Sequence, residues 1–316
     1  MLHCIRAGVA VAFLALCGQQ PVALAAEALT TNQPADSLSF VDLATMKSVA
    51  TLAIGGKPAG IALSPDRTKA YVTAPDSKEL VEVDAVSRVV TRRLALGGGP
   101  LGIAAHPSLP EVYVADWFSH RVIVVDARSL TVTGTIEVGQ SPSGLAVTPD
   151  GRLLLSADRD SDSISIIDIA TRTRVASMPA GQRPFGVTID AKGERAYIAN
   201  VKSNNVSVID IAARRLIGTI PTGRRPYAVA LARGRGFSTD QYGGGITVFD
   251  LGTLLPIKTV RLCDHPEGIE ADASGGDVYV ACWGDNVLIR LDADTLKVTG
   301  KAEVGDGPRA FGKFLR

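Results

Sequence analysis

A repeat with a period of about forty residues constrains this chain more than any other feature. A Gly-x-x-Pro motif recurs, and successive motifs start 42, 42, 42, 42, 40 and 42 residues apart. The motifs begin at Gly55, Gly97, Gly139, Gly181, Gly223, Cys263 (which replaces the glycine before Pro266) and Gly305. An Asp follows a strand-opening apolar or aromatic residue by 13 positions in six units, at Asp84, Asp126, Asp168, Asp210, Asp250 and Asp292. Because several registers persist together, we conclude that the repeat is real.

Each unit is predicted to form four short strands. Within Gly181–Thr222 the expected strands are Gly186–Ile189, Arg195–Ala199, Val206–Asp210 and Leu216–Ile220. They are rich in Val, Ile, Tyr and Thr, and Gly, Pro, Asn and Asp separate them. Four-stranded units of this length are typical of β-propeller blades. The expected fold is therefore an all-β propeller.

Residues 1–25 are predicted to be a cleaved secretory signal peptide. Arg6 is followed by the apolar run Val9–Leu16, and Ala23-Leu24-Ala25 supplies small residues for cleavage. A lipoprotein anchor at Cys17 is disfavoured because Leu16 is bulky. We therefore expect a periplasmic protein without a membrane span. Its single domain would cover residues 26–316.

The two ends of the predicted domain complement each other. Leu29–Asp42 matches Tyr197–Asp210, so the N-terminus is expected to supply the second, third and fourth strands of a blade. Pro308–Leu315 would supply only a first strand. The last of seven blades is thus expected to combine one C-terminal strand with three N-terminal strands. Such closure leaves no open sheet edge.

Several short motifs resemble the YVTN-repeat β-propellers. They include Gly-x-x-Pro-x-Gly, the Ser/Thr-Pro-Asp turn at Ser64 and Thr148, and Tyr-Val at Tyr71 and Tyr113. The resemblance covers residues 29–315 and implies a secreted bacterial seven-bladed protein. Some proteins of this family are found alongside pyrroloquinoline-quinone-dependent alcohol oxidation. The motifs specify a fold, and one fold hosts many activities.

Metal and cofactor chemistry is not expected. One Asp per unit ends the third strand before a tight turn, where its carboxylate can accept turn amide hydrogen bonds. The histidines are few and dispersed, and there is no haem-attachment, nucleophile-elbow or phosphate-loop motif. We predict neither a metal nor a cofactor.

Two cysteines remain after cleavage, Cys263 and Cys282. They lie at the same end of a predicted antiparallel hairpin. The periplasm is oxidising, so we predict a disulfide between them. It would hold the loop that carries Asp264, His265 and Glu267.

The loops that carry the Gly-x-x-Pro motif, called the motif loops below, differ between the two halves of the ring. The residues beside the motif proline are mostly small or aliphatic in the early units. The later units carry charged and aromatic residues there: Arg183, Phe185, Arg225, Tyr227, His265, Glu267 and Arg309. Loops joining the second and third strands share that end and add Trp117, Phe118, Arg159, Lys202, Tyr242 and Trp283. Arg can bind anions bidentately and aromatic rings can stack. We therefore predict that this arc binds an anionic or aromatic group.

The preferred functional hypothesis is a monomeric binding or accessory protein for a periplasmic protein or a small molecule. An alternative is a lactonase-type hydrolase, in which Glu267 and His265 act as acid and base beside Arg225 and Arg309. Arginines interleaved with aromatics also suit single-stranded nucleic acid. Removal of Arg6 leaves 32 basic residues against 32 acidic ones, and this balance weighs against that reading. A noncatalytic subunit that docks a redox partner is a further alternative.

Overall fold

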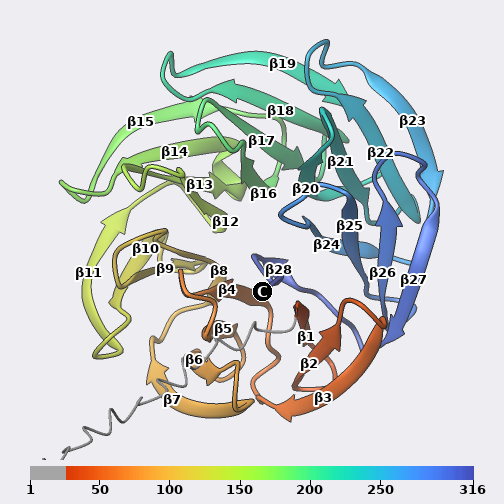
Figure 1. The fold of residues 1–316 in the computed structure, drawn as a ribbon. Coiled ribbons are helices and arrows are strands. Elements are labelled where there is room, and N and C mark those ends of the chain that lie inside the picture. The colour runs from red at the N-terminus through yellow and green to blue at the C-terminus, as the bar shows by residue number, and fades with distance from the viewer. Residues whose placement is uncertain (1–25) are drawn as a thin grey trace, which may run out of the picture.

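The computed structural model describes residues 26–316, and the signal-peptide prediction lies outside them. The described chain is all β, with a single 3-10 turn, η1 (Arg159–Ser161), as its only helical element. No helix within it is long and apolar enough to cross a membrane. The predicted seven-bladed propeller is confirmed, and Figure 1 shows its seven sheets around a central axis.

Blades 1 to 6 each contribute four consecutive strands, with the first strand nearest the axis. Blades 1 to 3 contain β4 (Gly60–Leu63), β5 (Lys69–Ala74), β6 (Glu79–Asp84), β7 (Val89–Ala95), β8 (Pro100–Ala105), β9 (Glu111–Asp116), β10 (Arg121–Asp126), β11 (Thr131–Glu137), β12 (Pro142–Val147), β13 (Leu153–Asp158), β14 (Ser163–Asp168) and β15 (Thr173–Pro179). Blades 4 to 6 contain β16 (Pro184–Ile189), β17 (Arg195–Asn200), β18 (Asn205–Asp210), β19 (Arg215–Pro221), β20 (Pro226–Ala232), β21 (Arg235–Asp240), β22 (Gly245–Asp250), β23 (Pro256–Arg261), β24 (Pro266–Ala271), β25 (Asp277–Cys282), β26 (Val287–Asp292) and β27 (Val298–Glu303). The four strands predicted in residues 181–222 correspond to β16–β19, with ends that shift by up to two residues.

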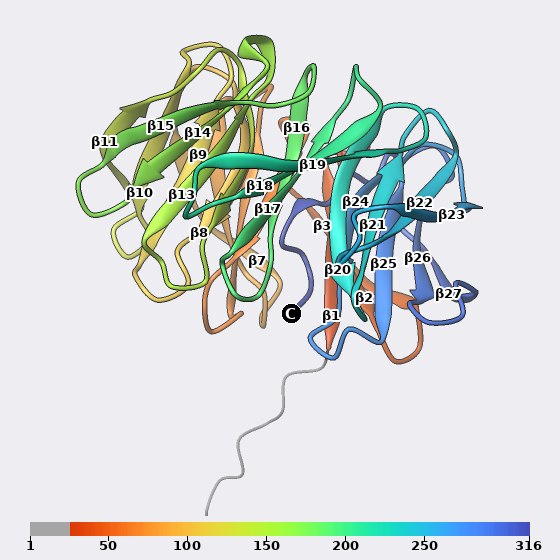
Figure 2. The same ribbon diagram turned by 90° about the horizontal axis from the view of Figure 1, so that it is seen from above.

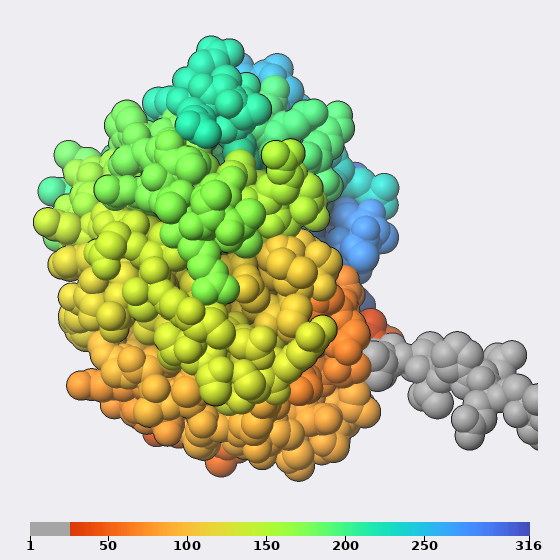
Figure 3. Space-filling view, turned by 90° about the vertical axis from the view of Figure 1, so that its left-hand side faces the viewer, coloured from red at the N-terminus to blue at the C-terminus, as the bar shows by residue number. Residues whose placement is uncertain are grey.

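Burial follows the order of the strands. The second and third strands are buried almost throughout, as in β13 and β14, because both of their faces pack against neighbouring blades. One such interface brings together Tyr113, Val122, Leu154 and Ile167 from blades 2 and 3. The fourth strands are mostly exposed, and β7, β11 and β15 form the rim that faces the viewer in Figure 3. The apolar core is therefore divided into clusters that lie between neighbouring blades.

The predicted turn role of the repeated aspartates is confirmed. The carboxylate of Asp168, for example, accepts the amide hydrogen of Thr171 at 2.8 Å. The same contact, spanning three residues, occurs at Asp42, Asp84, Asp126, Asp210, Asp250 and Asp292. These carboxylates stabilise turns at the ends of the third strands.

Blade 7 contains three N-terminal strands, β1 (Glu27–Asn32), β2 (Ser37–Asp42) and β3 (Lys47–Ala53). The C-terminal segment runs antiparallel to β1: the Arg309 amide bonds the Thr31 carbonyl at 2.7 Å, and the Leu29 amide bonds the Phe314 carbonyl at 2.9 Å. It is not a regular first strand. Its two-residue strand β28 (Phe311–Gly312) pairs in parallel with β4 of blade 1. The chain end thus lies at the centre of the ring (Figures 1 and 2).

In blades 3, 4, 5 and 7 a buried Asp or Asn at the end of the second strand contacts the motif glycine of the same blade. A Cβ on Gly181 would lie 2.6 Å from the Asn200 amide carbon, so only glycine permits this approach.

In blade 5 the side chain that contacts the motif glycine is Asp240, which is 1% exposed and accepts a hydrogen bond from the Thr247 hydroxyl at 2.7 Å. Its other carboxylate oxygen has no hydrogen-bond partner within the described chain. Burial raises the pKa of Asp240 to about 6.

We predict that Asp240→Asn stabilises the protein at neutral pH. A carboxyl whose pKa is raised by folding binds its proton more tightly in the folded state than in the unfolded state. Its ionisation therefore lowers the stability of the folded protein; the loss grows from about pH 4 to about pH 6 and stays constant above that. The penalty is about 3 kcal/mol at pH 7 and vanishes below pH 4, where both states are protonated. Asn200 shows that an amide fits the equivalent position. Urea unfolding across this pH range should give curves for the variant and wild type that diverge as pH rises.

Asp116→Asn is the matched control for this prediction. Asp116 occupies the same place in blade 2, but hydrogen bonds from the Gly99 amide and Arg121 lower its pKa despite burial. Its replacement should therefore cost stability above pH 4. Parallel curves for Asp240→Asn and wild type would contradict the raised pKa.

Candidate functional site

The motif loops are held in place by one repeated contact. The residue before the motif proline adopts a left-handed backbone in most blades, with φ of 55° at Arg183 and 54° at Arg225. This conformation is uncommon for residues other than glycine. The Arg183 amide donates to the Asp162 carboxylate at 2.7 Å, and the Arg225 amide donates to the Asn204 side chain at 2.8 Å. These two motif loops are thus tied to the preceding blade, which places both arginines at the same end of the ring.

A basic pocket opens between blades 3, 4 and 5. Its volume is about 380 Å³, and none of the described residues that line it is a carboxylate. The lining includes five cations: Arg159, Arg183, Lys202, Arg224 and Arg225. Arg159 pairs with Asp160 at 2.9 Å, whereas the other four make no salt bridge within residues 26–316. Burial and the nearby Arg183 lower the pKa of Arg159. The cations therefore repel one another, and a bound anion would relieve that repulsion.

An aromatic chamber of about 400 Å³ adjoins the basic pocket. Arg159, Val201 and Arg225 line both cavities. The apolar lining of the chamber includes Pro75, Pro100, Leu101, Trp117, Phe118, Phe185 and Tyr227, and its polar lining adds Arg309 and Gln241. Phe118 is 71% exposed. The two cavities form a single funnel with an apolar half and a cationic half.

The C-terminal segment supports the floor of the chamber. The Phe311 ring lies 4.8 Å from Phe185 and 5.4 Å from Tyr227, and those two rings are 4.6 Å apart. Because Phe311 also pairs through its backbone with β4, it spans the axis between blades 1, 4 and 5. Sequence reasoning missed this residue. The repeat itself could have indicated it. Phe311 stands three residues after the motif proline, where the other blades have aliphatic residues such as Ile61 and Val187.

Glu267 lies behind the chamber wall. Its side chain is 2% exposed; the Arg309 Nε donates to it at 2.8 Å, and the Gln241 amide donates at 2.6 Å. Arg309 in turn lies 5.8 Å from the centre of the Tyr227 ring, and burial raises the pKa of that phenol well above its usual value. Glu267 therefore holds Arg309 in position, and it does not line either cavity.

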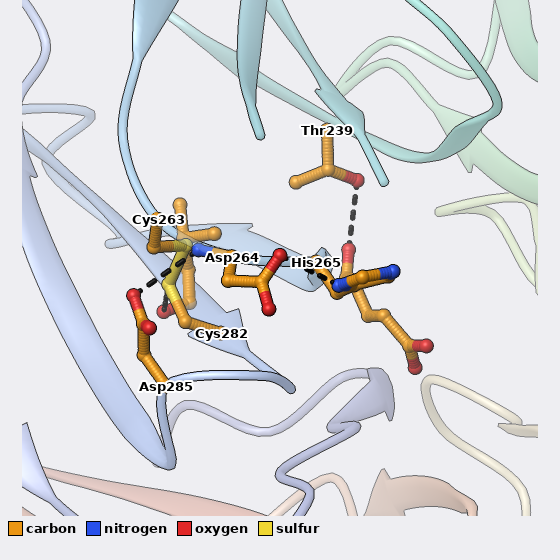
Figure 4. The surroundings of a disulfide bond; sticks show 8 residues. Thr239, Cys263, Asp264, His265, Cys282 and Asp285 are labelled. Carbon is orange, nitrogen blue, oxygen red and sulfur yellow. Dashed lines mark hydrogen bonds and ion pairs between the residues drawn. A yellow bond between two sulfur atoms is a disulfide. The ribbon is translucent and has the colours of Figure 1, made fainter. Parts of the chain in front are cut away.

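His265, Tyr242 and Trp283 form a separate cluster beside the funnel. The His265 ring lies 5.0 Å from Tyr242 and 6.1 Å from Trp283, edge-on to both, and its Nδ1 is 2.7 Å from the Asp264 carboxylate. Figure 4 shows this Asp264–His265 pair beside the disulfide. Arg225 stacks on Tyr242 at 4.3 Å and so links the cluster to the basic pocket.

The predicted disulfide is confirmed. Cys263 and Cys282 are bonded with their Cα atoms 6.0 Å apart. Cys263 replaces a motif glycine, and Cys282 replaces the buried Asp or Asn that this glycine contacts in blades 3, 4, 5 and 7. The covalent bond thus takes over a contact that is noncovalent elsewhere. Residues 26–316 contain no group of three or more His, Cys, Asp or Glu side chains that could hold a metal ion.

Comparison with known proteins establishes the class. Residues 61–219 match the family described as "Lactonase, 7-bladed beta-propeller", and the chain belongs to this family. No curated protein sequence matches it.

Several solved structures share the fold. The Kuenenia stuttgartiensis hydrazine synthase has a TM-score of 0.72 at 22% identity, covering 81% of this chain and 89% of that one. A functionally unknown protein from Desulfotomaculum acetoxidans DSM 771 has a TM-score of 0.74 at 15% identity, covering 90% and 99%. The dihydro-heme d1 dehydrogenase NirN, solved in complex with DHE, has a TM-score of 0.68 at 15% identity, covering 89% and 74%. At these identities the likeness concerns the fold alone.

We predict that Glu267→Ala destabilises the protein by about 3 kcal/mol, because it leaves the Arg309 charge without its partner in a largely buried site. Glu79→Ala is the control, since the Glu79–Arg93 pair is more exposed and its loss should cost under about 1 kcal/mol. Chemical unfolding at pH 7 measures both changes. Equal losses in the two variants would show that Glu267 does not hold Arg309 in this way.

Proposed function

We propose that this propeller is a periplasmic binding protein that captures an anionic small molecule in its funnel. The observation that carries the proposal is the basic pocket, where five cations surround one cavity and no residue of the range 26–316 adds a carboxylate to the lining. Charge-assisted hydrogen bonds from arginine to an anion are strong and geometrically specific. The periplasmic location rests on the sequence of residues 1–25.

The resemblance to YVTN-repeat propellers extends this proposal. Some of those proteins accompany pyrroloquinoline-quinone-dependent alcohol oxidation, and we propose an accessory role of that kind. The funnel would then bind the small molecule, while the broad faces of the ring are available to a protein partner. Native mass spectrometry of the protein released from its own periplasm would detect either one as added mass.

Charge reversal tests the binding site directly. Arg183→Glu and Arg225→Glu should each weaken binding of small di- and tricarboxylates about 100-fold, which corresponds to about 3 kcal/mol. Isothermal titration calorimetry at fixed ionic strength measures the affinities. Arg215→Glu is the matched control, because Arg215 lies exposed on the outer strand β19 of blade 4. Unchanged affinity in Arg183→Glu and Arg225→Glu would refute the site.

A lactone hydrolase is the second candidate, and the family match favours it. Of the two predicted acid–base residues, Glu267 is held by Arg309 and Gln241, whereas His265 is partly exposed and pairs with Asp264. The Asp264–His265 pair has the arrangement of an oriented general base. Arg225, stacked on the neighbouring Tyr242, could stabilise a developing oxyanion.

A broad lactone panel separates the two candidates. If the protein is a hydrolase, wild type turns over at least one lactone, and His265→Gln reduces kcat about 100-fold or more by removing the base. Unfolding curves should show that this variant retains wild-type stability. No turnover on the panel would eliminate the hydrolase hypothesis. The anion-binding proposal does not depend on that result.

A further inference from the structure

We propose that the funnel selects a planar aromatic molecule with at least two carboxylates along one edge. The inference rests on the proposed anion-binding function and specifies its ligand class. The aromatic plane would occupy the chamber, and the carboxylates would occupy the basic pocket. Four features of the funnel support this ligand class.

The first feature is the shared wall. Arg159 and Arg225 line both the basic pocket and the aromatic chamber. A ligand held by these two residues therefore contacts both cavities at once. Its charged and apolar parts must lie close together on one molecule, because the same side chains line both spaces.

The second feature is the way these arginines are held. The Arg159 guanidinium lies 5.2 Å from the Trp117 ring centre, and that of Arg225 lies 4.3 Å from the Tyr242 ring centre. Stacking on an aromatic ring leaves the in-plane N–H groups of a guanidinium available for hydrogen bonds. One such group of Arg159 donates to Asp160 at 2.9 Å, and its remaining N–H groups and those of Arg225 face no carboxylate within the described chain. Such groups match the two oxygens of a carboxylate in a bidentate contact.

The third feature is the surplus of charge. Arg183, Lys202 and Arg224 add to the two wall arginines, and of the carboxylates in the described chain only Asp160 pairs with any of the five. A ligand with one negative charge would leave most of this repulsion in place. Two or more carboxylates are needed to balance the pocket, and an adjacent pair on one edge fits a single cavity of about 380 Å³.

The fourth feature is the shape of the chamber. Trp117, Phe118 and Phe185 present aromatic surface to it, and Phe118 is largely exposed. An aliphatic polyanion would leave this surface uncovered, whereas a planar ring system would stack on it. Phe311 packs behind Phe185 and Tyr227 across the axis, so the chamber has a floor. The site therefore suits a compact molecule and not a chain threading through the ring.

Four probes test the inference by isothermal titration calorimetry on the mature protein. Naphthalene-2,3-dicarboxylate has the proposed features, while cis-cyclohexane-1,2-dicarboxylate lacks the aromatic plane. Naphthalene-2-carboxylate lacks the second charge, and naphthalene-2,3-dimethanol lacks both charges. We expect the first probe to bind at least tenfold more tightly than each of the others.

Variants assign the two parts of the ligand to the two cavities. Phe118→Ala should weaken binding of naphthalene-2,3-dicarboxylate about tenfold and leave the cyclohexane dicarboxylate unchanged. Arg183→Glu should weaken both dicarboxylates. Leu255→Ala, which removes an exposed apolar side chain on blade 5 outside the lining of both cavities, is the control and should alter neither.

Each other outcome has a defined meaning. Equal affinity for the two dicarboxylates would overturn the aromatic selectivity and leave the anion-binding function standing. Equal affinity for naphthalene mono- and dicarboxylate would overturn the requirement for two charges. Failure of every anion to bind would refute the inference together with the proposed function.

Discussion

The antiparallel contact between the C-terminal segment and β1 is the interaction on which the rest of the structure depends. Besides the backbone bonds, the buried Glu27 carboxylate pairs with both Arg316 and Arg88, at 2.8 Å and 2.6 Å. These contacts join residues from the two ends of the chain and from blade 1. Without them, β1 and β4 would present open strand edges, which are prone to pair with other chains.

The same contact builds the centre of the funnel. Because the C-terminal segment leaves β1 to pair with β4, Phe311 reaches the axis and packs against aromatic rings of blades 4 and 5. It also places Arg309 beside Glu267 in blade 6. Ring closure and the floor of the chamber are therefore two consequences of one short segment.

The sequence predicted much of the fold and part of the candidate site. Arg183 and Arg225 could be assigned to one end of the ring because they share a register position beside the motif proline. The disulfide followed from two cysteines in the same hairpin. The sequence could not separate Glu267 from the arginines around it, because a register position does not specify which way a side chain turns. Only the structure shows Glu267 behind the wall, paired with Arg309. The sequence also could not show which of the predicted binding residues line the cavities. In the structure Tyr242, His265 and Trp283 form a cluster apart from both cavities.

The sequence alone determined the repeat, the number of blades and the end of the ring on which the motif loops gather. These properties follow from short-range patterns: strand alternation, turn residues and a fixed period. Only the tertiary structure decided that five cations converge on one pocket and that Phe311 closes the chamber beside it. Those contacts join residues from different blades, and their distances depend on how far the ring curves and how its last segment crosses the axis. No local pattern contains that information.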